Sequence, residues 1–260
     1  MKSLPQLLST LGLNAVPAAG WFVGSWSAGT TLGVYWFENV AASLLIGARI
    51  ALHRKWNPCR GHTQYQPRDK ERRGAKRSFL EYFLTTSLVF SAAHGFFLGM
   101  IILVLTLNGH GAEVGLNFRE LATGCGLVLA MLAADFAFDL RGLRAQPFAW
   151  IERQADANLG RVVVVHLSLI FGMAAVAFTG ANTAFFGVFI VLKTMADLSA
   201  RLPQWNPDKP PTWLCRIMDR VPNTQSGKAK DKRQTFAEFW VADKADEAAR
   251  LAANERPARE

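Results

Sequence analysis

Apolar residues in this chain are gathered into six long blocks that contain few charged residues. The blocks cover residues 4–23, 30–51, 79–107, 121–140, 162–179 and 184–202. A helix needs about 20 predominantly apolar residues to cross the hydrocarbon core of a bilayer. Most of the 29 Lys and Arg residues lie instead in the connections and in the C-terminal region. This separation predicts an all-α, polytopic transmembrane helical bundle with about six spans.

The number of basic residues alternates from one connection to the next. The connection at 52–78 holds nine Lys and Arg, the connection at 141–161 holds four, and the region from 203 onward holds eleven. The connections after the first, third and fifth blocks hold zero, one and zero. Cytoplasmic loops of membrane proteins collect Lys and Arg. The alternation therefore predicts a multi-pass membrane protein with both termini in the cytoplasm.

The chain divides into two predicted parts. Residues 1–202 form a membrane domain with a basic cytoplasmic loop at 52–78, and residues 203–260 form a cytoplasmic tail. In the tail, residues 212–221 place apolar side chains at helical spacing beside Arg216 and Arg220, which is typical of a short helix on a membrane surface. Thr235 and Glu238 form a capping-box pattern ahead of a final amphipathic helix at about 236–254.

The net charge of +9 bears on the partners of the chain. Basic cytoplasmic segments face anionic lipid, so the expected partners are the bilayer and anionic lipid head groups at the basic loop. Nucleic acid is not expected, because the basic segments flank spans and lack interleaved stacking aromatics. The cysteines Cys59, Cys125 and Cys215 have no pairing spacing and are expected to be unpaired thiols. Whether the chain forms a homo-oligomer or binds a protein partner is left open.

Six ionisable side chains inside the apolar blocks form the candidate intramembrane polar site: Glu38, His94, Asp135, His166, Lys193 and Asp197. Ionisable groups within spans are costly and usually face the protein interior. A rise of about 1.5 Å per residue places Glu38, His94 and Lys193 in a central layer and the other three in an inner layer. A buried Lys193 needs an anionic partner, which Asp197, one turn away, or Glu38 can supply.

Three functions are compatible with this site. In the first, the site moves protons or a small solute, as chains of carboxylates and His do in transporters. In the second, the chain is a membrane-bound metal- or haem-binding protein or enzyme that uses His94 and His166. No HxxxH pair lies on one helix, so no metal or cofactor is assigned. In the third, the chain is a structural or assembly protein whose polar residues join helices. Whether the chain is an enzyme stays open.

Short motifs at these residues resemble those of one bacterial family. Residues 35–39 (Tyr-Trp-Phe-Glu-Asn) resemble a Tyr-Trp-x-Glu-Asn motif, and residues 93–97 (Ala-His-Gly-Phe-Phe) resemble a His-Gly-Phe-Phe motif. Val165-His166-Leu167, followed by Lys193-Thr194 with Asp197, resembles a closing His and Lys-Thr-x-x-Asp pair. Over residues 14–199 the chain is similar to domain-of-unknown-function family 6498, a family of integral membrane proteins.

The resemblance implies a multi-pass fold in the bacterial inner membrane and no established activity. The family pattern places a Ser-His pair in the fourth span, where this chain has Ala134-Asp135. A metal site built on that His is therefore not carried over to this chain. The other candidate residues, Glu38, His94, His166, Lys193 and Asp197, match the family motifs.

Overall fold

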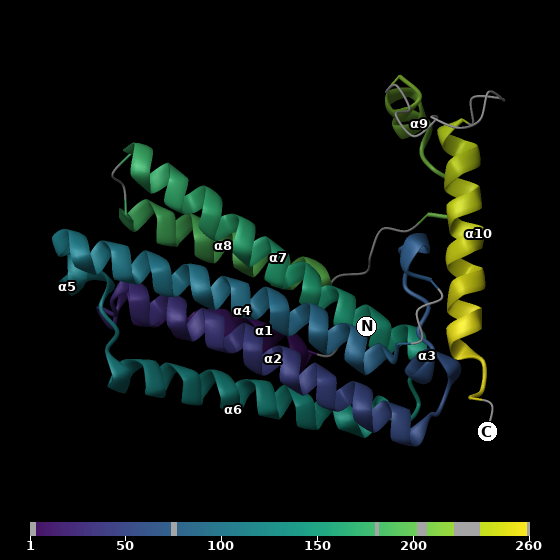
Figure 1. The fold of residues 1–260 in the computed structure, drawn as a ribbon, viewed down its shortest axis with the longest axis horizontal. Helices are drawn as coiled ribbons and strands as arrows, with labels where there is room; N and C mark the ends of the chain where they lie inside the picture. Colours follow the sequence, from purple (N-terminus) through teal and green to yellow (C-terminus); the bar gives the residue numbers. More distant parts are fainter. Residues whose placement is uncertain (1–3, 74–76, 180–181, 202–206, 221–234, 259–260) are drawn as a thin grey trace.

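The computed structural model describes residues 4–73, 77–179, 182–201, 207–220 and 235–258, and this part of the chain is helical and contains no strand. Its long helices run side by side along one direction, apart from the C-terminal one (Figure 1). They are α1 (Leu4–Phe22), α2 (Ala28–Trp56), α4 (Phe79–Leu105), α6 (Phe118–Leu143), α7 (Phe148–Thr179) and α8 (Asn182–Arg201). The predicted all-α class is confirmed.

Each predicted apolar block falls on one of these helices, but several helices extend beyond their block. α7 begins at Phe148 rather than at 162, and α2 continues to Trp56 rather than ending at 51. The additional turns are amphipathic, so hydropathy alone does not mark them as part of a helix. The start of α2 is fixed locally, because the Ser27 side chain accepts a hydrogen bond from the backbone N–H of Thr30.

By length and composition, two of the described helices could cross a membrane: Phe79–Gly109 and Phe118–Leu143. Only 17% and 22% of their most apolar segments are buried inside the molecule. An apolar helix in the core of a soluble protein would be mostly buried, so these two helices turn apolar side chains outward. Phe96, Phe97 and Leu103 are examples, each more than half exposed. These exposed faces indicate association with a membrane, and the other four predicted spans stay predictions.

The interior of the bundle is organised around α2, which packs against α1, α4, α6 and α7. One apolar cluster joins Ile50 of α2 to Phe83 of α4 and Ile151 of α7. Another joins Val34 of α2 to Val128 of α6 and Leu13 of α1. α6 approaches α2 closely at Gly124, where a Cβ atom would lie 2.7 Å from a methyl carbon of Val34. α2 is therefore the common partner of the other helices.

Short elements connect the long helices. α3 (Arg60–Thr63) and the 3-10 helix η1 (Lys70–Arg72) lie in the basic connection between α2 and α4. The π-helix η2 (Thr106–His110) and α5 (Gly111–Val114) follow α4. Gly109 has φ 89°, in the left-handed region that glycine adopts without steric cost, so the chain can turn there.

The C-terminal region contains α9 (Thr212–Met218) and α10 (Phe236–Glu255). Both sides of the predicted Thr235–Glu238 capping box are formed at the start of α10. α10 lies across one end of the bundle, beside α3 (Figure 1). Placement of residues 212–221 on a membrane surface, and the division into domains at 202, stay predictions.

Polar contacts fix α10 to the basic connection and to α7. The Arg250 guanidinium contacts both carboxylate oxygens of Glu152, and both residues are at most 3% exposed. The Tyr65 hydroxyl donates to Glu152 Oε1 at 2.6 Å. Asn254 Nδ2 donates to the backbone carbonyl of Gln66 at 3.1 Å. The final helix therefore belongs to the folded end of the bundle.

The Arg250→Met substitution should release α10 from the bundle. It leaves the buried Glu152 carboxylate without its cation, which typically costs about 3–5 kcal/mol. Hydrogen exchange of residues 236–255 should accelerate strongly. The control is Arg68→Gln, because the Arg68–Glu247 pair is exposed and such pairs contribute less than about 1 kcal/mol. Equal protection of α10 in both variants would contradict this role of Arg250.

Candidate functional site

Lys193 lies at the centre of a buried network of polar side chains from several helices. Its ammonium donates to Asn14 Oδ1 of α1 at 3.0 Å, to Glu38 Oε1 of α2 at 3.1 Å and to Asp197 Oδ2 of α8 at 2.9 Å. An ammonium has three donors, so all of them are used. Lys193 and Glu38 are 0% exposed. The predicted ion pair is present, and Lys193 contacts both predicted carboxylates.

A second cation, Arg161 of α7, contacts the same two carboxylates. Its Nη1 lies 3.3 Å from Glu38 Oε1, and its Nε lies 3.9 Å from Asp197 Oδ1. Two cations and two carboxylates therefore balance in charge. The sequence analysis placed Arg161 in a cytoplasmic connection, because it precedes an apolar block. The extension of α7 toward its N-terminus brings Arg161 into the helix and next to Glu38.

Neutral side chains continue the network from Arg161 toward α4. Arg161 Nη2 donates to Asn158 Oδ1 at 2.8 Å, and Asn158 Nδ2 donates to Ser43 Oγ at 3.0 Å. Ser87 Oγ of α4 donates to Ser43 Oγ at 2.5 Å, and Ser43 Oγ donates to the backbone carbonyl of Asn39. Sequence reasoning missed these uncharged residues. Helical spacing could have indicated two of them, because Asn39 and Ser43 are one turn apart on α2 and therefore share a face of the helix.

Several buried polar atoms beside this network have no hydrogen-bond partner among the described residues: Tyr35 Oη, Glu38 Oε2, both side-chain amide atoms of Asn39, and Ser91 Oγ. These residues are at most 3% exposed. The bond between Ser43 and Ser87 sets an antiparallel register of α2 and α4 that places Asn39 opposite Ser91. A buried polar group without a partner costs about 1–3 kcal/mol. Water or a small polar solute between α2 and α4 would supply the missing partners.

The other predicted site residues, outside the contacts of Lys193 described above, are His94, Asp135 and His166. His94 is buried on the same face of α4, one turn beyond Ser91. Asp135 does not bind Lys193, because it lies with Asp139 at 3.3 and 3.1 Å from Arg49 Nη2. α6, which carries Asp135, packs against α1 and α2, whereas α8 packs against α1 and α7. Asp135 and Asp197 therefore belong to two separate ion-pair groups, and their placement in one inner layer stays a prediction. His166 lies on α7, and its side chain is outside the described residues.

The structure also pairs two histidines that sequence spacing did not connect. His53 Nδ1 lies 2.8 Å from His62 Nε2, and His53 Nε2 lies 2.9 Å from the backbone carbonyl of Gln146. The carbonyl only accepts, so His53 Nε2 donates to it and His62 Nε2 donates to His53 Nδ1. Burial, aided by His53 and Arg54, lowers the pKa of His62 to about 3. The neutral His62 thus stabilises this end of the bundle above pH 6.5, and the contribution is lost as the pH falls toward 3.

Metal binding gains no support from the described side chains. Among them, no group of three or more His, Cys, Asp or Glu could hold a metal ion. The proposed pair of ligands, His94 and His166, stays a prediction, because the His166 side chain lies outside the described residues. The described network around Lys193 is built from an ammonium, a guanidinium, carboxylates, amides and hydroxyls.

Removing Lys193 should destabilise the protein by about 3–5 kcal/mol, because Lys193→Met leaves two buried carboxylates with Arg161 alone. The double variant Lys193→Met, Asp197→Asn should lose less than the sum of the two single losses, since the two residues interact directly. Thermal unfolding in detergent measures both. Met195→Leu is the matched control, because Met195 is 62% exposed on the same helix. Additive losses would show that Lys193 and Asp197 are not coupled.

Comparison with known proteins gives a family and no activity. No curated protein and no solved structure matches the chain. The model of a family of unknown function, DUF6498, matches residues 1–213. The matched region contains every residue of the network, from Asn14 to Asp197. The family resemblance predicted from the motifs is confirmed: the chain belongs to DUF6498, a family of unknown function.

Proposed function

We propose that the protein is a six-span membrane protein that moves protons or a small polar solute through the network around Lys193. The observation that carries this proposal is a fully buried ammonium shared by two carboxylates, beside polar atoms that lack partners within the described part of the chain. Burying an ionisable residue within a membrane span costs free energy, and in membrane proteins such residues commonly mark proton and solute pathways. A network that only joined helices would be expected to satisfy its own polar atoms.

The arrangement of the helix ends supports the six-span topology. The end of α2, the start of α4, the end of α6 and the start of α7 share one apolar cluster, formed in part by Ile50, Phe79, Leu143 and Ile151. The two most basic connections of the membrane domain therefore meet at one end of the bundle. Positive residues gathered at a single end are typical of the cytoplasmic side. The unequal charge of the two ends gives the bundle an orientation in the inner membrane of a bacterium.

The network can exchange a proton without a large change in structure. Glu38 and Asp197 each contact both Lys193 and Arg161, so a proton gained by one carboxylate shifts both cations toward the other. Glu38 Oε2 and Asp197 Oδ1 have no hydrogen-bond partner among the side chains that the structure describes, and they are the positions open to a proton. The unpartnered atoms of Tyr35, Asn39 and Ser91 lie next to Glu38 along α2 and α4. Water or solute held there would connect with the carboxylate.

Reporter fusions test the topology. Fusions after Gly109 and after Thr183 should report the periplasm, and fusions near Gln64 and at the C-terminus should report the cytoplasm, because Lys and Arg mark the cytoplasmic side. A periplasmic C-terminus would contradict the six-span topology.

Proton flux into liposomes tests the activity. Purified protein with an internal pH-sensitive dye should dissipate an imposed pH gradient faster than empty liposomes do. Glu38→Gln preserves shape and removes the shared carboxylate charge, so it should abolish most of this flux. The matched control is Asp139→Asn, an apolar-block carboxylate that pairs with Arg49 outside the network. Equal flux in the wild type and Glu38→Gln would exclude Glu38 from a proton path. A solute, rather than protons, would then remain to be tested in the same liposomes.

A further inference from the structure

The short helix α9 carries apolar side chains that its own fold leaves exposed. Trp213, Ile217 and Met218 are 59%, 52% and 40% exposed, and no residue of α9 is buried. Trp213 and Ile217 are one turn apart, so they form one face of the helix, called here the Trp213 face. A helix of seven residues is too short to be stable in water by itself. A surface that covers the Trp213 face would therefore stabilise α9.

α10 holds α9 at both of its ends. The Trp240 indole N–H donates to the backbone carbonyl of Pro207, ahead of α9, at 3.3 Å. The Asp219 carboxylate, at the end of α9, accepts a hydrogen bond of 2.8 Å from the backbone N–H of Phe236. These contacts place α9 beside the start of α10 and do not use the Trp213 face.

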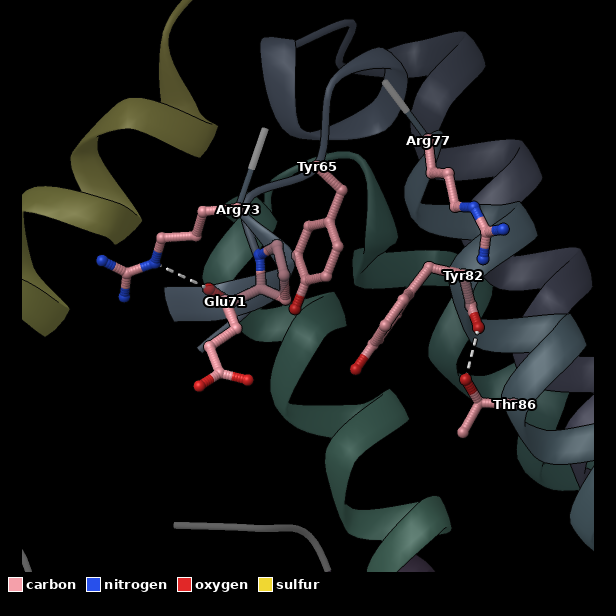
Figure 2. A pocket seen from close by; sticks show the side chains of 7 residues that line it. Tyr65, Glu71, Arg73, Arg77, Tyr82 and Thr86 are labelled. Carbon is pink, nitrogen blue, oxygen red and sulfur yellow. Dashed lines mark hydrogen bonds between the residues drawn. The ribbon is translucent and has the colours of Figure 1, made fainter. Parts of the chain in front are cut away.

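α10 is in turn fixed to the basic end of the bundle, where the connections at 52–78 and 141–161 meet. Figure 2 shows Arg73 pointing toward α10, where its guanidinium lies 2.8 Å from the Asp246 carboxylate. Farther along α10, Arg250 contacts the buried Glu152 of α7. α10 therefore acts as an arm between the bundle and α9, and it gives α9 a defined place beside the long helices.

That place coincides with a membrane surface in the topology proposed above. α10 runs across the basic end of the bundle, and α9 lies at the far end of α10, on the side that faces the bundle (Figure 1). Along the direction of the long helices, α9 is level with their turns at the basic end, and it lies to the side of the bundle. A bilayer around the bundle would have its cytoplasmic surface at this level and would meet α9.

The residues of α9 suit the interface of a bilayer. Trp is enriched at membrane–water interfaces, where its amphipathic ring lies at the level of the head groups. Arg216 is exposed three residues after Trp213, and Arg220 is exposed directly after the helix. Interfacial helices combine an apolar face with such cations, which attract anionic lipid. A soluble protein that covered the Trp213 face would have to occupy the space beside the bundle that the bilayer fills.

We propose that α9 lies in the head-group layer of the cytoplasmic leaflet and binds anionic phospholipid. Trp213 and Ile217 face the acyl chains, and Arg216 and Arg220 contact the phosphates. α10 is the arm that holds α9 at this depth. The inference rests on the membrane placement proposed above and is independent of proton or solute movement through the Lys193 network.

Hydrogen exchange of residues 212–218 in nanodiscs tests the proposal. The full chain is placed in phosphatidylcholine alone and in phosphatidylcholine mixed with phosphatidylglycerol, and exchange should be slower in the mixture. Replacing Arg216 and Arg220 by Gln should lower the ratio of bound to detached α9 about fivefold for each arginine. Trp213→Ala should accelerate exchange in both membranes. The matched control is Val241→Ala, which removes a side chain that is 57% exposed on α10 and should leave exchange unchanged.

Lipids that carry bromine on the acyl chain near the head group test the contact directly, because bromine quenches tryptophan fluorescence at short range. The quenched part of the fluorescence should decrease in Trp213→Phe. Equal exchange in the two membranes would overturn the preference for anionic lipid. Unchanged exchange in Trp213→Ala, or unchanged quenching in Trp213→Phe, would overturn the lipid contact itself. Glu38→Gln should leave the exchange of α9 unchanged, so a failure of the Lys193 pathway leaves this result readable.

Discussion

The interior of this protein depends on the burial of one ammonium group. Lys193 is fully enclosed, and its charge is stable there because Glu38, Asp197 and Asn14 receive all three of its hydrogen bonds. These partners come from α1, α2 and α8, and Arg161 adds α7. Four helices must therefore keep their relative positions for the charges to balance. The apolar clusters give the bundle cohesion, and the charges fix its register, since a shift of one turn would separate the pairs.

The network is balanced in charge and incomplete in hydrogen bonding. Ser43 illustrates the satisfied part, because its hydroxyl accepts from Ser87 and Asn158 and donates to a backbone carbonyl. Asn39, one turn away, has both side-chain amide atoms without a partner among the described residues. A rigid structural core has no use for such a gap, because every unpaired polar atom lowers stability. Under the proposed function, protons or polar solute that pass through the network would satisfy these atoms in turn.

The basic end of the bundle has a different physical character. There α10 returns to the connection between α2 and α4, and the Arg250–Glu152 pair is buried among aromatic rings such as Tyr65. Three cations of that connection, Arg68, Lys70 and Arg73, pair with carboxylates of α10. The C-terminal region thus neutralises part of the positive charge at this end of the bundle.

The sequence by itself determined the class of the fold and the type of residue at the site. Segregation of apolar and charged residues located the long helices, the capping box marked the start of α10, and helical spacing paired Lys193 with Asp197. Only the tertiary structure decided which helices are neighbours. It separated Asp135 from Asp197, added Arg161 and Asn14, and brought His53 to His62. The physical reason is that depth along a helix follows from residue number, whereas contact between helices depends on how side chains pack around α2.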